Sequence, residues 1–169
     1  MQQNVKQLVD RFRMLPHPEG GYFKETYRSA ELVHKESLPE RFAGDRHFST
    51  AIYFLLEQGN FSAFHRIKSD ECWHFYAGYP LLIHVIYPDG MYEMIRLGNH
   101  FTEGQHFQSV VPAGCWFASE TAQDGSYSFV GCTVSPGFDF ADFELAVAAD
   151  LEKLCPAKTE LIRQLCRQS

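Results

Sequence analysis

A run of short alternating segments in the middle of the chain most constrains its fold. Between residues 49 and 134, polar and apolar residues alternate in eight segments, which is the pattern of half-buried β-strands. Turn residues separate them, among them Gly78, Pro88-Asp89-Gly90 and Asp124-Gly125. The predicted strands are 49–56, 62–67, 71–77, 81–87, 92–97, 106–111, 116–120 and 127–134. Eight strands at hairpin spacing predict an antiparallel sandwich or barrel.

The flanks of this β region predict helices. Asn4 is a candidate N-cap for a helix that Pro16 and Pro18 end, and a second helix is expected from about Asp142, which would cap it. Pro156 interrupts that helix, and a short terminal helix follows. Residues 22–28 alternate like another strand, whereas the polar residues 30–47 predict a surface loop. At 169 residues, the chain is expected to form a single domain over residues 1–169.

Composition excludes several classes of function. The net charge is −6 and there is no basic run, which argues against nucleic-acid binding. No apolar run approaches the roughly 18 residues of a membrane span. The five cysteines are odd in number and lack C-x-x-C spacing, so reduced thiols and a cytoplasmic location are expected. The 15 Phe and 8 Tyr indicate a bulky core or a wide apolar cavity.

The stretch 59–78, GNFSAFHRIKSDECWHFYAG, carries the strongest motif. Gly59, His65, Glu71 and Gly78 resemble the first motif of the cupin superfamily, in which a second histidine stands where this chain has Ile67. Pro112-Ala113-Gly114 resembles the centre of the second cupin motif, but Phe117 replaces its histidine. The resemblance implies a double-stranded β-helix, the RmlC-like cupin jelly roll, here an all-β fold with short N- and C-terminal helices.

Longer motifs narrow the resemblance to one cupin family. HPEGGYF (17–23), SDECWHFYAG (69–78) and PGFDFADFE (136–144) occur in the order of that family and span most of the chain. The resemblance implies a homodimer but no settled reaction. The nearest functional analogues that it suggests are sugar-nucleotide epimerases of the same fold, which work without a metal.

Two of the four motif ligands are apolar, which predicts that no catalytic metal and no other cofactor is held. His65 and Ile67 share one face of a strand, expected to be the barrel interior. One His and one Glu fall short of a catalytic zinc or non-haem iron site. His74 should face the opposite side of its strand, and the facing of His106 cannot be read; either remains a candidate substitute ligand.

His65 and Glu71 are therefore predicted to form an acid–base pair. A His near neutrality beside a carboxylate can move a proton next to a carbonyl, as an epimerase or isomerase requires. Trp73, Phe117 and Ile67 are predicted walls of the substrate pocket, with core packing as the alternative role of the two aromatic residues. His17 and Glu19, in a turn rich in Pro and Gly, are predicted at the pocket rim, with local capping or pairing as the alternative.

Three functions remain open. The first is a metal-free epimerase or isomerase acting on a sugar or nucleotide-like substrate. The second is a small-ligand-binding module in which the His–Glu pair satisfies itself and has no catalytic role. The third is a metal-dependent cupin such as a dioxygenase, which Ile67 and Phe117 disfavour. The expected partners are a small carbohydrate or nucleotide-like ligand and a second copy of the chain, with no nucleic acid and no membrane.

Overall fold

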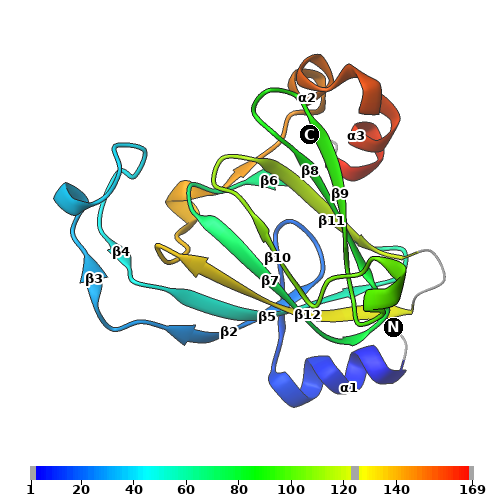
Figure 1. The fold of residues 1–169 in the computed structure, drawn as a ribbon. Helices are drawn as coiled ribbons and strands as arrows, with labels where there is room; N and C mark the ends of the chain where they lie inside the picture. The colour runs from blue at the N-terminus through cyan, green and yellow to red at the C-terminus, as the bar shows by residue number, and fades with distance from the viewer. Residues whose placement is uncertain (1–2, 123–125, 168–169) are drawn as a thin grey trace.

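Two antiparallel sheets face each other in the computed structural model, which describes residues 3–122 and 126–167 (Figure 1). The six-stranded sheet has the order β1 (Leu15–Pro16), β2 (Tyr22–Arg28), β5 (Thr50–Glu57), β12 (Tyr127–Ser135), β7 (Asp70–Gly78) and β10 (Gln108–Val111). The five-stranded sheet has the order β13 (Glu144–Leu145), β6 (Phe61–Arg66), β11 (Trp116–Thr121), β8 (Leu81–Ile86) and β9 (Tyr92–Leu97).

The eight predicted strands of residues 49–134 are confirmed, with small shifts at their ends. They correspond to β5 through β12, and the predicted strand 22–28 is β2. The main difference is that β10 begins at Gln108, because His106 instead forms an isolated parallel bridge with Leu97. The turn predicted at Asp124-Gly125 lies outside the described residues.

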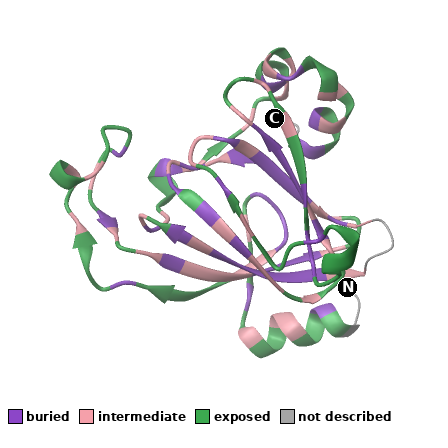
Figure 2. Cartoon of the chain, viewed as in Figure 1, coloured by how far each residue is buried: buried purple, intermediate pink, exposed green. Residues whose placement is uncertain are grey.

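The main core fills the space between the two sheets. Alternation on β12 places Val130, Cys132 and Val134 inside, where they meet Trp73 of β7 and Phe117 of β11. Buried residues accordingly follow the inner faces of both sheets (Figure 2). This arrangement of two packed antiparallel sheets is the predicted jelly roll.

Helices cover parts of the outer faces. The helix α1 (Gln3–Phe12) packs its Val5 and Phe12 against Leu55 and Phe129 of the six-stranded sheet. On the five-stranded sheet, α2 (Ala148–Leu154) and α3 (Thr159–Leu165) bury Leu151 and Ile162. Short 3-10 turns are η1 (Lys35–Ser37), η2 (Phe101–Glu103), η3 (Phe140–Asp142) and η4 (Pro156–Lys158). Among the described residues, no helix has the length and apolar character needed to span a membrane.

The helix predicted from Asp142 is wrong at its start. Residues 140–142 form η3, residues 144–145 pair with β6 as β13, and α2 begins only at Ala148. Asp142 caps no helix; its carboxylate instead binds Arg46 in a buried ion pair, with Nε–Oδ2 and Nη2–Oδ1 distances of 2.6 Å. Tertiary pairing therefore overrides the helical pattern of the sequence over this stretch.

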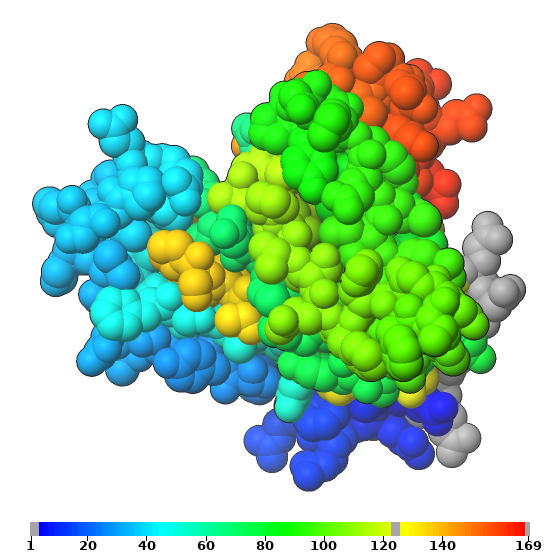
Figure 3. All heavy atoms as spheres, in the orientation of Figure 1, coloured from blue at the N-terminus to red at the C-terminus, as the bar shows by residue number. Residues whose placement is uncertain are grey.

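The predicted surface loop 30–47 is partly structured. It forms an arm, residues 29–47, in which β3 (Leu32–Val33) pairs with β4 (Arg46–His47), and Figure 1 shows it projecting from the two sheets. Phe42 is fully buried in it beneath the guanidinium groups of Arg41 and Arg46. In Figure 3, the segment near residue 140 lies at the surface between this arm and the body.

Candidate functional site

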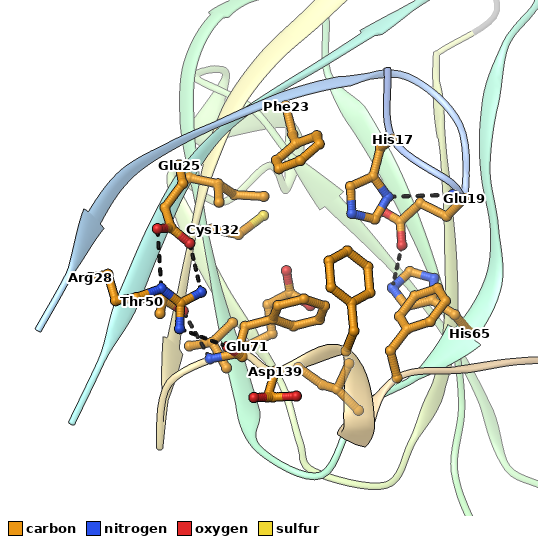
Figure 4. Close-up of a pocket in the computed structure, with 16 residues that line it drawn as sticks. His17, Glu19, Phe23, Glu25, Arg28, Thr50, His65, Glu71, Cys132 and Asp139 are labelled. Carbon is orange, nitrogen blue, oxygen red and sulfur yellow. Dashed lines mark hydrogen bonds and ion pairs between the residues drawn. The ribbon is translucent and has the colours of Figure 1, made fainter. Parts of the chain in front are cut away.

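The structure contains a cavity of about 340 Å³ (Figure 4). Its walls come from β2, β5, β6, β7 and β12, from the HPEGGYF turn, and from the segment 138–143. Apolar and charged side chains share the lining. They are His17, Glu19, Phe23, Glu25, Arg28, Thr50, Ile52, His65, Ile67, Glu71, Cys132, Val134, Phe138, Asp139, Phe140 and Phe143.

Glu19 is the direct partner of His65. His65 Nε2 lies 3.0 Å from Glu19 Oε2, and Nδ1 lies 2.7 Å from the carbonyl oxygen of Ala63. A carbonyl oxygen only accepts hydrogen bonds, so Nδ1 must carry a proton. The contact with a carboxylate then favours a second proton on Nε2, which makes His65 an imidazolium held by Glu19.

The shifts in pKa agree with this ion pair. Burial lowers the pKa of His65, but the charge and the hydrogen bond of Glu19 outweigh it, so the pKa is raised above its usual value. Burial raises the pKa of Glu19, and the charge and hydrogen bond of His65 reverse this, so its pKa is lowered. Both shifts favour the charged forms, although each side chain is at least nine-tenths buried.

The HPEGGYF turn carries Glu19 to this position. Gly20 has a φ of 121°, and a Cβ there would lie 2.0 Å from the carbonyl oxygen of Phe61, so only glycine allows this close approach to β6. The carbonyl oxygen of Glu19 accepts hydrogen bonds from the backbone N–H of Ala63 (2.9 Å) and from Arg167 Nη2 (3.0 Å). The turn is thereby fixed to β6, the strand that carries His65.

His17 extends the pair on its other side. Its Nδ1 lies 3.6 Å from Glu19 Oε1 and accepts a 3.3 Å hydrogen bond from the backbone N–H of Glu19. Burial lowers its pKa, which the charge of Glu19 only partly offsets. His17 is therefore neutral near pH 7 and carries its ring proton on Nε2. Both residues predicted at the pocket rim thus line the cavity.

Glu71 lines the same cavity and forms no ion pair with any residue in the described part of the chain. Burial raises the pKa of its carboxyl to about 7; the charge of His65 lowers it, that of Glu19 adds to the rise, and a hydrogen bond from the Cys132 thiol lowers it. The predicted direct pairing of His65 with Glu71 is replaced by the pair His65–Glu19, because the turn brings Glu19 onto Nε2. Glu71 is consequently a carboxyl that changes charge near neutral pH.

The remaining sequence-predicted residues divide between wall and core. Ile67 lines the cavity on the same side as His65, as alternation predicts. Trp73 and Phe117 are each 1% exposed and lie in the core behind the wall. Phe117 is the cross-strand neighbour of His65 and lies on the same face of the sheet, with ring centroids 4.1 Å apart. It packs against the His65 ring from the core and not from the cavity.

The side chains around His65 do not fit a cupin metal centre. Both ring nitrogens of His65 are engaged by the protein, and Ile67 and Phe117 offer no lone pair. Among residues 3–122 and 126–167, no three His, Cys, Asp or Glu side chains gather as a set of metal ligands. His74 lies on the outer face of β7 between Thr133 and Gln108, and His106 is exposed, so neither reaches His65 as a substitute.

Two groups of cavity residues were not predicted from the sequence. Phe138, Phe140 and Phe143 close one side of the cavity. At the mouth, Arg28 binds Glu25 through two hydrogen bonds of 3.1 and 2.7 Å and donates to the carbonyl oxygen of Phe138 at 3.2 Å. The spacing of three phenylalanines in FDFADF was the one signal that could have indicated a wall.

Comparisons with known proteins agree with the fold. A protein of Leishmania major with a solved structure is 37% identical, covering 96% of this chain and 98% of that one, with a TM-score of 0.87. A Shewanella oneidensis protein is also 37% identical, and its structure matches with a TM-score of 0.87. The match covers 99% of this chain and 100% of the other. Oxalate decarboxylase of Bacillus subtilis is 14% identical, with a TM-score of 0.54. The match covers 91% of this chain and 37% of the decarboxylase chain, and it shows a shared fold alone.

Two further matches concern the sequence itself. An uncharacterized protein of Saccharomyces cerevisiae is 30% identical over 148 residues, covering 82% of this chain and 73% of that protein. The family described as Cupin superfamily (DUF985) matches residues 6–146. The match spans both sheets, the HPEGGYF turn and the phenylalanine wall, and the chain therefore belongs to the Cupin superfamily (DUF985) family.

Proposed function

We propose that this cupin is a metal-free, small-molecule enzyme of the epimerase or isomerase type that acts on a sugar or sugar-nucleotide. Glu71 is its proton-transfer group, and the His65–Glu19 pair places a positive charge in the same cavity. The observation that carries the proposal is the juxtaposition, in one cavity, of a carboxyl with a pKa of about 7 and a buried imidazolium. A group that titrates near the working pH is the most effective general acid or base.

The reaction can be written with this chain's own residues. The Glu71 carboxylate takes the proton from the carbon next to the substrate carbonyl, and the electron pair of that C–H bond moves onto the carbonyl oxygen. The positive charge of His65 stabilises the resulting enolate. Glu71 then returns the proton to the same carbon from the other face of a reoriented intermediate, or to the neighbouring carbon, and the carbonyl is restored.

The cavity walls suit a small ring or short carbon chain. About 340 Å³ lies near the lower end of typical ligand pockets. Phe23 and Phe143 provide apolar surface, whereas His17 Nε2, Glu71 and Cys132 offer polar groups to hydroxyls. The same features would also serve a ligand-binding module, so the experiment must measure turnover and not only binding.

Solvent exchange tests the proposal across a panel of candidate substrates. The protein is incubated in D₂O with glucose, mannose, fructose, their 6-phosphates and nucleoside-diphospho-keto-sugars, and proton NMR follows each C–H next to a carbonyl. We expect deuterium to replace that proton in at least one compound, at a rate proportional to the protein concentration. Binding by calorimetry without exchange in any compound would instead support the ligand-binding module.

Absence of a bound metal is part of the proposal and has its own test. Tag-free protein is analysed for zinc, iron, manganese, nickel and copper, and exchange is measured before and after dialysis against a chelator. We expect far less than one equivalent of each metal and an unchanged exchange rate. One equivalent that is lost together with exchange would support the metal-dependent cupin.

We also propose that a second copy of the chain covers the open part of the six-stranded sheet. The helix α1 covers one end of its outer face, but Tyr27, Tyr76 and Val110 remain 54%, 50% and 48% exposed there. Multi-angle light scattering at micromolar concentration should give a homodimer, and Tyr76→Glu should shift it toward the monomer. A monomeric wild type at that concentration would contradict this assembly.

A further inference from the structure

Both cations of the cavity lining are already paired with carboxylates. Arg28 holds Glu25 with two hydrogen bonds, and His65 holds Glu19 at 3.0 Å. His17 is kept neutral by burial. An anionic group of a ligand would therefore have to break an existing ion pair before it could find a positive charge.

Two carboxyl groups of the lining are in the opposite situation. Among the residues that the structure describes, Glu71 has only the Cys132 thiol as a hydrogen-bond donor, and Asp139 at the mouth accepts a hydrogen bond only from the backbone N–H of Ala141, at 2.8 Å. Neither has a side-chain cation within ion-pair distance among the ion pairs of the described residues. A cation that enters this cavity therefore meets two carboxyl groups that have no counter-ion among the described residues.

The aromatic wall adds a second preference of the same sign. The rings of Phe138, Phe140 and Phe143 meet edge to face, with centroids 5.0 to 6.4 Å apart, and Phe140 is 58% exposed at the mouth. Phe23 stands on the opposite wall in Figure 4. The faces of such rings carry partial negative charge and attract organic ammonium groups.

We infer that the substrate class is an amino-bearing sugar, or a similarly small amino-carbonyl compound, without a phosphate or nucleotide group. The inference rests on the proposed function and narrows its substrate from sugars and sugar-nucleotides to amino sugars. The ammonium group lies between the phenylalanine wall and the two unpaired carboxyls, Glu71 and Asp139. The carbonyl end then lies toward His65.

Proton release on binding is a consequence that calorimetry can detect. Glu71 is faced by His65, Glu19 and Cys132, and Arg28, Glu25 and Asp139 complete the charged lining. A ligand cation beside Glu71 favours its ionised form, so the carboxyl gives up a proton near pH 6.5. A neutral ligand leaves that proton in place.

Three hexoses that differ in charge provide the test. Glucosamine, glucose and glucose 6-phosphate are titrated into the full chain by isothermal calorimetry at pH 6.5, in two buffers of different ionisation enthalpy. We expect glucosamine to bind roughly tenfold more tightly than glucose. Glucose 6-phosphate should bind more weakly than glucose, and only glucosamine should release a proton. Equal or tighter binding of glucose 6-phosphate, or no binding of glucosamine, would overturn the inference.

Matched variants assign the preference to the cavity. Glu71→Gln and Asp139→Asn keep the shape of the side chains but remove their charge, and each should reduce the preference for glucosamine over glucose about threefold to tenfold. Glu120→Gln changes another His–Glu pair, with His84, on the five-stranded sheet outside the cavity, and should leave it unchanged. A preference unchanged in both cavity variants contradicts the inference.

The outcome separates this inference from the proposed function. Deuterium exchange in glucose 6-phosphate or a nucleotide sugar, together with weak binding of glucosamine, would keep the enzyme and reject the amino-sugar class. Tight binding of glucosamine that releases a proton but gives no exchange would keep the ligand class and reject catalysis.

Discussion

Replacing Glu71 with glutamine should reduce solvent exchange into the substrate by about a hundredfold to ten-thousandfold, the usual contribution of a general acid or base. Glutamine fills the same space but cannot accept the proton. In the wild type, exchange should rise with pH and level off above pH 7, because only the ionised Glu71 is active and its pKa is about 7. The variant should lose this pH dependence together with its activity.

The same substitution should stabilise the protein at alkaline pH. Because the pKa of Glu71 is higher in the folded chain than in the unfolded chain, folding binds a proton between roughly pH 4.5 and 7. The stability that this contributes is complete below pH 4.5 and is lost as pH rises through 7. Glutamine avoids the loss, so the free energy of unfolding at pH 8 should exceed that of the wild type by up to about 3 kcal/mol.

Urea unfolding at pH 5 and pH 8, combined with the exchange assay, checks both effects. Glu120→Gln is the matched control, because it alters a partly buried His–Glu pair outside the cavity and should retain wild-type exchange. A Glu71→Gln protein that exchanges normally would remove Glu71 from the mechanism. A variant less stable than the wild type at pH 8 would contradict the raised pKa.

Replacing Arg46 with methionine should destabilise the fold by about 3–5 kcal/mol, because it leaves the Asp142 carboxylate buried without its main partner. Arg46 and Asp142 are each 5% exposed at the side chain, and Lys68, 3.6 Å from Asp142, gives only partial compensation. For a chain of this size, such a loss corresponds to a fall in Tm of about 6–20 °C. Thermal unfolding followed by circular dichroism measures it.

The double variant Arg46→Met with Asp142→Leu distinguishes an unpaired charge from lost packing. It should recover much of the stability, because no charge is then left buried. It should still impair ligand binding, since Asp142 belongs to the short segment that carries Phe140 and Phe143 into the cavity wall. A single Arg46→Met change that costs less than about 1 kcal/mol would mean that this ion pair contributes little.

Much of the fold could be predicted, because the residues within each strand and at its ends indicate the strand by themselves. Each strand from β5 to β12 alternates or is bounded by turn residues, and both signals lie within a few positions. The helix predicted from Asp142 failed for the opposite reason. The residues FELAVAADL satisfy a helical period, and those from Ala148 on are helical, but Glu144 and Leu145 instead pair with β6, a strand that lies almost 80 positions away in the sequence.

The candidate site was predictable in its membership more than in its pairing. Motif spacing and strand alternation brought His65, Ile67 and Glu71 to one cavity, and the turn chemistry of HPEGGYF indicated His17 and Glu19. The ion pair between Glu19 and His65 Nε2 depends on the close approach of Gly20 to β6. No local sequence pattern encodes that approach. Strand alternation likewise predicts which face of the strand carries Trp73 or Phe117. It does not predict that both side chains lie in the core behind the cavity wall.

The long chain separation between the walls of the cavity has a consequence for how the protein matures. His17 and Glu19 emerge early during synthesis, whereas the phenylalanine wall follows more than a hundred positions later and is held by Arg28, 110 positions from Phe138, and by Arg46, 96 positions from Asp142. Contacts of such separation form late, because long loops must first close. A nascent chain that ends before residue 138 therefore lacks both Asp139 and the phenylalanine wall, so ligand added during synthesis can stabilise only the last stage of folding.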